Sequence, residues 1–137
     1  MFVLLVLGGV GLCCALVSRI QHKREAAYRA QQREATYQSA LQLYSETLKP
    51  GMDRKHLEDN LRARSVVFTQ MCCILEKSAF ADLVKIGEEE ERPWYCSEHY
   101  VYIAFQFVAA ENQSDFHPHN SDILKTTTIF HQLGGCP

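Results

Sequence analysis

The chain has 137 residues and a formal net charge of −2, and 47% of its residues are hydrophobic. This length allows one folded domain and not two, and the hydrophobic content is sufficient for a normal core. The near-balance of charges excludes the basic excess that is typical of nucleic-acid-binding proteins. We therefore expect no nucleic acid among the partners.

The chain begins with an uncharged apolar segment. Residues 1–17 read MFVLLVLGGVGLCCALV, and with continuation to Ile20 the segment has the length of roughly 20 residues that a helix needs to cross a bilayer. A cleaved signal peptide is the alternative, but its basic start and its small-residue cleavage site are missing. We therefore predict a single-pass membrane anchor over residues 1–20, in effect a signal-anchor.

The residues after this segment give conflicting indications of topology. Arg19, Lys23 and Arg24 follow the apolar run closely enough to contact anionic lipid head groups. Basic flanks of this kind favour the cytoplasmic side of the membrane, whereas abundant domain cysteines favour an oxidising compartment. A start codon assigned too late would remove the conflict. We expect the domain to be extracytoplasmic.

Residues 21–48 are rich in Ala, Gln, Glu and Arg and are predicted to form a long helix. Residues 21–36 are polar on nearly every side, which indicates a helical stalk. The next residues carry one apolar stripe at helical spacing, which predicts a packing face. The stripe consists of Tyr37, Leu41, Tyr44 and Leu48. The folded domain is therefore expected to span residues 37–137.

A second, shorter helix is predicted after a break at Lys49-Pro50-Gly51. Asp53 is suited to cap its first turn, because a carboxylate accepts hydrogen bonds from free backbone amides. Met52 and Leu57 have the spacing of a hydrophobic staple. The helix should end near Arg64.

The remaining chain has the patterns of four β-strands. They are expected at residues 66–73, 81–87, 99–109 and 123–133, joined by polar connections. Helices followed by strands in this order predict an α+β fold. Its elements would be an N-terminal membrane helix running into the long helix, the short second helix, and a four-stranded antiparallel meander packed on the helices.

Aromatic side chains offer the best candidates for contact with a protein partner. Tyr100 and Tyr102 alternate with core residues and would lie on the open face of the sheet. Trp94 and Tyr95 follow a proline and would form a binding hot spot if exposed; the alternative is that Trp94 closes the open end of the sheet. Glu88–Glu91 would attract a cation or a basic partner, or form a solvated loop.

Four cysteines lie in the domain: Cys72, Cys73, Cys96 and Cys136. Disulfides, free buried thiols and metal ligation are all compatible with an even number of them. A hairpin centred between residues 115 and 116 places Cys96 opposite Gly135, which is the neighbour of Cys136 in the sequence. This arrangement predicts a Cys96–Cys136 disulfide. A bridge from Cys72 or Cys73 to Cys96 is the alternative. Adjacent cysteines of a strand should point to opposite faces.

Two loop histidines, His117 and His119, have a spacing that suits zinc or nickel, and His131 would be the third ligand. Solvent-exposed histidines are the simpler interpretation, so no metal or other cofactor is expected. No nucleophile, phosphate-binding or zinc-protease motif is present. The sequence therefore predicts a membrane-anchored binding or assembly module without catalytic activity. The alternative is a thiol-redox or metal-binding module that uses the domain cysteines or the His117/His119 loop.

The segment LKPGMDRKHLEDNL, residues 48–61, resembles the turn of the BamE/SmpA-like group, within the wider beta-lactamase-inhibitor-protein-like fold. Pro50, Gly51, Met52 and Arg54 match that turn, and Asp53 replaces its usual hydroxyl cap. The resemblance covers about 14 residues and the order of the elements. It implies an α+β domain that acts in binding or assembly. This chain differs in its plain anchor, its extra strand and its cysteines, and a fold likeness does not fix function.

Overall fold

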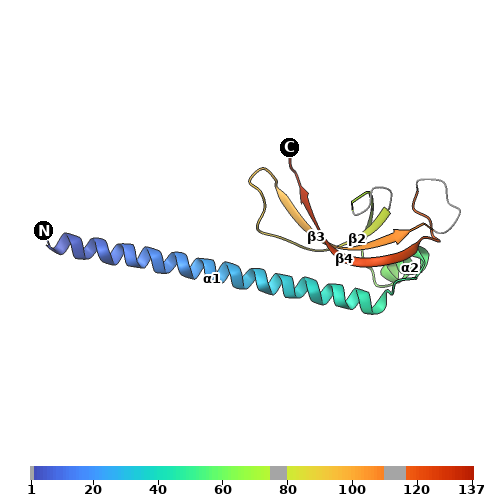
Figure 1. Cartoon of the computed structure of the whole chain (residues 1–137), viewed down its shortest axis with the longest axis horizontal. Coiled ribbons are helices and arrows are strands. Elements are labelled where there is room, and N and C mark those ends of the chain that lie inside the picture. The colour runs from blue at the N-terminus through green and yellow to red at the C-terminus, as the bar shows by residue number, and fades with distance from the viewer. Residues whose placement is uncertain (1, 75–79, 110–116) are drawn as a thin grey trace. The chain divides into compact units, whose positions relative to one another are not determined.

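The computed structural model describes residues 2–74, 80–109 and 117–137, with side chains described from Val17 onward (Figure 1). Two helices precede four strands: α1 (Phe2–Thr47), α2 (Arg54–Ala63), β1 (Thr69–Cys72), β2 (Phe80–Glu88), β3 (Glu98–Val108) and β4 (Ile123–Gly134). The strands form one antiparallel sheet in the order β1-β2-β3-β4. The predicted α+β class and the antiparallel meander are confirmed.

The chain divides into two compact units, residues 1–36 and residues 37–137. Within the part of the chain that the structure describes, no helix is long and apolar enough to cross a membrane. The prediction of a single-pass membrane protein, with an anchor over residues 1–20 and an extracytoplasmic domain, is therefore wrong. Within α1, Arg19, Lys23 and Arg24 are all exposed, and charges at this density oppose burial in hydrocarbon.

Helix α2 begins and ends where its sequence predicts. Asp53 is the N-cap, and its Oδ1 accepts a hydrogen bond from the backbone N–H of His56 at 2.8 Å. Met52 packs against the hydrophobic cluster that contains fully buried Leu57, as a hydrophobic staple requires. The break before the helix uses Gly51, whose φ of +92° is a conformation that glycine adopts without steric cost.

The three longer strands lie within one or two residues of their predicted bounds, whereas β1 is shorter at both ends. Val66 instead follows the C-terminal end of α2, and its N–H donates back to the carbonyl of Leu61 at 2.9 Å. At the other end, Cys73 adopts a φ of +66°, which is incompatible with extended backbone. Local hydrogen bonding and a left-handed residue therefore confine β1 to four residues.

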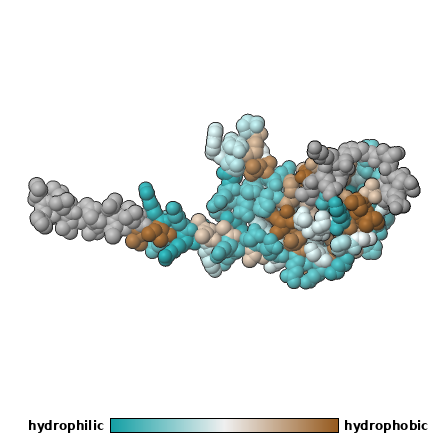
Figure 2. All heavy atoms as spheres, in the orientation of Figure 1, coloured by the Kyte–Doolittle hydropathy of each residue, from teal (hydrophilic) through white to brown (hydrophobic). Residues whose placement is uncertain are grey.

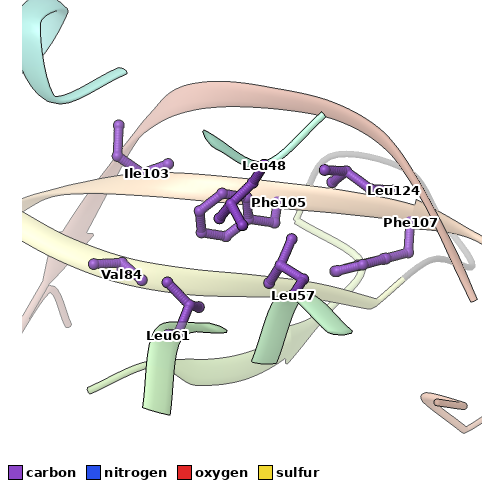
Figure 3. Close-up of a cluster of buried hydrophobic side chains, with 8 residues drawn as sticks. All are labelled: Leu48, Leu57, Leu61, Val84, Ile103, Phe105, Phe107 and Leu124. Carbon is purple, nitrogen blue, oxygen red and sulfur yellow. The ribbon is translucent and has the colours of Figure 1, made fainter. Parts of the chain in front are cut away.

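The main hydrophobic core lies between one face of the sheet and the helices (Figure 3). Its buried side chains come from the residue after α1 and from α2, β2, β3 and β4: Leu48, Leu57, Leu61, Val84, Ile103, Phe105, Phe107 and Leu124. Leu41 and Tyr44 pack against this cluster, and Tyr37 is only 4% exposed. The predicted packing stripe of the first helix is therefore confirmed.

Tyr37 also contacts β2 at a bulge in that strand. Its hydroxyl donates to the carbonyl of Glu88 at 3.2 Å. The ring lies so close to Gly87 that a Cβ at that position would come within 2.6 Å of it. The register between β2 and β3 shifts at this glycine, and a residue without a side chain is what such a close approach requires.

The opposite face of the sheet holds a smaller cluster. Ala81, Leu83 and Ala104 are buried there, and Tyr102 and Phe130 pack against them with half-buried side chains. Tyr100 is also half-buried. This face is therefore partly accessible at its aromatic residues, as the alternation in residues 99–109 predicts.

A charged group lies inside the domain beside the main core. Arg54 is 1% exposed, and its Nη1 donates to Oδ1 of fully buried Asp82 at 2.8 Å. Its Nη2 donates to the carbonyl of Phe80, and its Nε lies 3.4 Å from Oδ2 of buried Asp122. The guanidinium also lies 4.0 Å from the centre of the Phe107 ring. One arginine thus joins α2, β2 and the start of β4.

Burial raises the pKa of Asp82 to about 7, although the neighbouring Arg54 charge opposes this rise. Its folded-state pKa lies above the ordinary value of 3.8, so this carboxyl group favours the folded state at low pH. That contribution is lost as the pH rises from about 4 through about 7.

We expect the wild-type protein to lose stability relative to Asp82→Asn over this pH window, by up to about 1.4 kcal/mol for each pH unit. Urea denaturation of both proteins at several pH values measures the difference. Parallel stability curves for the two proteins would show that Asp82 does not titrate in this range.

Candidate functional site

A disulfide joins Cys96 to Cys136, 40 residues apart, as the sequence predicts. The hairpin of β3 and β4 brings them together, since Glu98 pairs with Gly134 at its open end. The pairing differs by one residue from the expected register, because a bulge lies between Gln106 and Phe107. Cys96 is 4% exposed, so the bridge is anchored in the domain interior.

The other two domain cysteines form a disulfide with each other. Cys72 and Cys73 are adjacent, and their Cα atoms lie 3.7 Å apart. The expectation that they point to opposite faces of a strand is therefore wrong, and so is the alternative bridge to Cys96. The reason is local: β1 ends at Cys72, and the left-handed backbone of Cys73 turns its side chain back toward its neighbour.

Trp94 is exposed at 95% and adjoins Tyr95, which is 50% exposed. Their rings make an edge-to-face contact with centres 5.8 Å apart. The interpretation that Trp94 closes the end of the sheet is therefore wrong. The alternative interpretation, an exposed aromatic pair, describes the structure.

The backbone on the C-terminal side of this aromatic pair is well held. The N–H of Cys96 donates to the carbonyl of Pro93 at 3.0 Å, which closes a turn around the pair. The N–H of Ser97 then donates to the carbonyl of Gly134 at 3.1 Å. Together with the Cys96–Cys136 disulfide, these bonds fix the base of a loop whose aromatic side chains reach into solvent.

Other exposed hydrophobic residues are scattered. On the face drawn in Figure 2, they appear as separate brown patches of the domain within hydrophilic surface. Among the aliphatic residues whose side chains the structure describes, Val67 is highly exposed, at 83%. Single apolar residues are common on protein surfaces, but two adjacent large aromatic side chains on one loop are a recognised feature of binding sites.

Beside this loop lies an open hollow of about 590 Å³, lined by Glu91, Arg92, Pro93, His99, His131 and Leu133. Two histidines meet in it. Nε2 of His99 lies 3.2 Å from Nδ1 of His131, and Nδ1 of His99 lies 2.7 Å from the carbonyl oxygen of Glu91. The aromatic loop, the disulfide and the histidine pair thus occupy the same end of the sheet.

The predicted contact residues Trp94, Tyr95, Tyr100 and Tyr102 form two pairs. Tyr100 and Tyr102 make an edge contact with ring centres 6.3 Å apart. Nζ of Lys85 lies 3.9 Å from the centre of the Tyr100 ring, and a hydrogen bond with Glu98 raises the pKa of Tyr100. These tyrosines are half-buried by their neighbours, so Trp94 and Tyr95 are the better exposed pair.

A metal ion at His117 and His119, the alternative interpretation of this loop, would not have His131 as its third ligand. His131 pairs with Val101, eight residues along β4 from Ile123, which is about 26 Å of extended chain. Within the loop, the backbone N–H of His119 donates a hydrogen bond to Oδ2 of Asp122. In the described ranges, no group of three or more His, Cys, Asp or Glu residues is arranged to hold a metal ion.

Several important residues were missed from the sequence. Asp82 could have been identified from the sequence, because it lies on the same face of its strand as Val84 and Ile86, which point toward the core. A carboxylate on that face requires a buried partner. No local pattern identifies Arg54 as that partner, because it lies 28 residues away on another element. The His99–His131 pair depends on strand register, which the sequence fixes only approximately.

No family model, curated protein or solved structure matches this chain. The likeness of residues 48–61 to the BamE/SmpA-like turn therefore stays a prediction.

Proposed function

We propose that this protein is a small binding module that recognises a basic surface of a protein partner through Trp94 and Tyr95. The single observation that supports this most strongly is the 95% exposure of Trp94 on a loop with an anchored base. Tryptophan and tyrosine dominate binding energy at protein interfaces, because they bury a large area and lose little conformational entropy.

The charge around the loop indicates the chemistry of the partner. The preceding segment, Glu88–Glu91, supplies four carboxylates, and Glu98 follows the loop. Lys85 pairs with Glu88, but the segment as a whole remains acidic. An exposed indole face attracts a guanidinium or an ammonium group, and nearby carboxylates add to this attraction. An arginine- or lysine-bearing protein surface therefore suits this site better than an acidic one.

Proximity labelling in the native host tests this proposal. It compares a double variant, Trp94→Ala/Tyr95→Ala, with a matched control, Val67→Ala, which removes an 83% exposed apolar side chain outside this loop. We expect the double variant to lose a specific partner by at least tenfold in recovered signal, and the control to retain it. Fluorescence of Trp94, the only tryptophan, should then change when the purified partner is added. An unchanged set of labelled proteins in the double variant would refute the proposal.

A further inference from the structure

We propose that His99 and His131 form a binding site for a divalent transition metal ion, with Cu²⁺ as the best-matched ion. The ligand atoms would be Nε2 of His99 and Nδ1 of His131, which lie 3.2 Å apart. This site is separate from the His117/His119 loop, and it does not depend on the proposed partner site at Trp94.

The first ligand is already oriented for this purpose. Nδ1 of His99 lies 2.7 Å from the carbonyl oxygen of Glu91. A carbonyl oxygen can only accept a hydrogen bond, so the proton of neutral His99 resides on Nδ1 and the lone pair resides on Nε2. Metal-binding histidines typically have this arrangement, in which a backbone carbonyl holds one ring N–H and leaves the other nitrogen as ligand.

The second ligand lies at the distance that a shared ion requires. Two imidazole nitrogens that bind one metal at about 2.0–2.1 Å are about 2.9 Å apart at adjacent tetragonal positions and about 3.3 Å apart with tetrahedral geometry. The observed 3.2 Å separation lies between these two values. In the metal-free protein, the N–H at Nδ1 of His131 donates to Nε2 of His99 across the 3.2 Å separation. Metal binding replaces that bridging proton, which moves through solvent to Nε2 of the exposed His131 ring, so the number of bound protons is unchanged.

The scaffold holds both rings in place. His99 is in β3 and His131 is in β4, two strands that pair over most of their length. His131 pairs with Val101, which is fully buried, and the Cys96–Cys136 disulfide closes the same end of the hairpin. Ligands on paired strands keep their separation better than ligands on loops.

The hollow leaves room for further ligands. Its volume of about 590 Å³ accommodates water molecules around an ion, and Glu91 lines it. Two protein nitrogens with water and an oxygen donor suit the tetragonal coordination of Cu²⁺. Among first-row divalent ions, imidazole sites bind Cu²⁺ most tightly, so we expect weaker binding of Zn²⁺ and Ni²⁺.

Calorimetric titration of the full chain with Cu²⁺, with its disulfides intact, tests the proposal. We expect one bound ion, and at least a tenfold weaker affinity in His99→Ala and in His131→Ala. The matched control is the double variant His117→Ala/His119→Ala, which removes two other histidines and should bind within twofold of wild type. Equal affinity of His131→Ala and wild type, or loss of binding in the control, would overturn the assignment.

Spectroscopy of the wild-type protein provides a readout that does not depend on how the variants fold. The electron paramagnetic resonance spectrum with one equivalent of Cu²⁺ should show coupling to two imidazole nitrogens. Addition of Zn²⁺ should shift the ¹⁵N resonances of His99 Nε2 and His131 Nδ1 together and leave those of His117 in place. A spectrum with one coupled nitrogen, or a Zn²⁺ shift confined to other histidines, would reject the site.

Discussion

Replacement of Arg54 by alanine is expected to reduce the free energy of unfolding by about 3–5 kcal/mol, the cost of removing one partner from a buried ion pair. The guanidinium contacts Asp82 and Asp122, both of which are buried. Without it, each carboxylate has to remain charged in the interior or take up a proton, and both outcomes cost free energy at pH 8. Urea denaturation followed by circular dichroism measures the loss.

Arg62→Ala is the matched control for this experiment. It removes an arginine from the same helix whose side chain is 58% accessible; its partner Asp59 is exposed, and its partner Glu58 is buried but also accepts a hydrogen bond from Gln70. We expect a smaller loss, of about 1 kcal/mol, because solvent screens the Arg62 charge and Glu58 keeps a hydrogen-bond partner. If Arg54→Ala costs no more than Arg62→Ala, the buried charges do not stabilise the fold as described.

Removal of the Cys96–Cys136 disulfide with the double variant Cys96→Ser/Cys136→Ser is expected to cost about 4 kcal/mol. The bridge spans 40 residues, and a closed loop of that size lowers the entropy of the unfolded chain by an amount that corresponds to this figure. Chemical denaturation of the oxidised wild-type protein and the variant provides the comparison.

The second disulfide offers a matched control. Cys72 and Cys73 are adjacent, so their bridge closes almost no loop, and the same entropy argument assigns it about 1 kcal/mol or less. The variant Cys72→Ser/Cys73→Ser should therefore remain close to wild type in stability. Similar losses in the two double variants would show that loop closure is not the main source of stabilisation.

Local signals predicted much of the fold. The Asp53 cap, the Gly51 break and the stripe that begins at Tyr37 each depend on neighbours within one or two helical turns, and each is found as expected. The disulfide between Cys96 and Cys136 was also predictable, because the alternation of two long strands restricts their register to within about one residue.

The remaining features depend on contacts that no local pattern contains. The Arg54–Asp82 pair joins residues 28 positions apart on different elements. The Cys72–Cys73 bridge depends on the left-handed backbone conformation of Cys73, which the presence of a cysteine does not predict. The membrane anchor was inferred from hydrophobic length alone, and the structure does not support it. The exposure of Trp94 was one of two alternatives that only the three-dimensional structure separates.

The order of the strands has a consequence for how this domain folds. Each strand pairs with its neighbour in the sequence, so the sheet contains no crossover and every pairing joins strands that are consecutive in the chain. Low contact order of this kind is associated with fast folding, because little chain entropy is lost before the first contacts form. The hairpin of β3 and β4 has the most extensive pairing, so we expect its native contacts to contribute strongly to the transition state for folding.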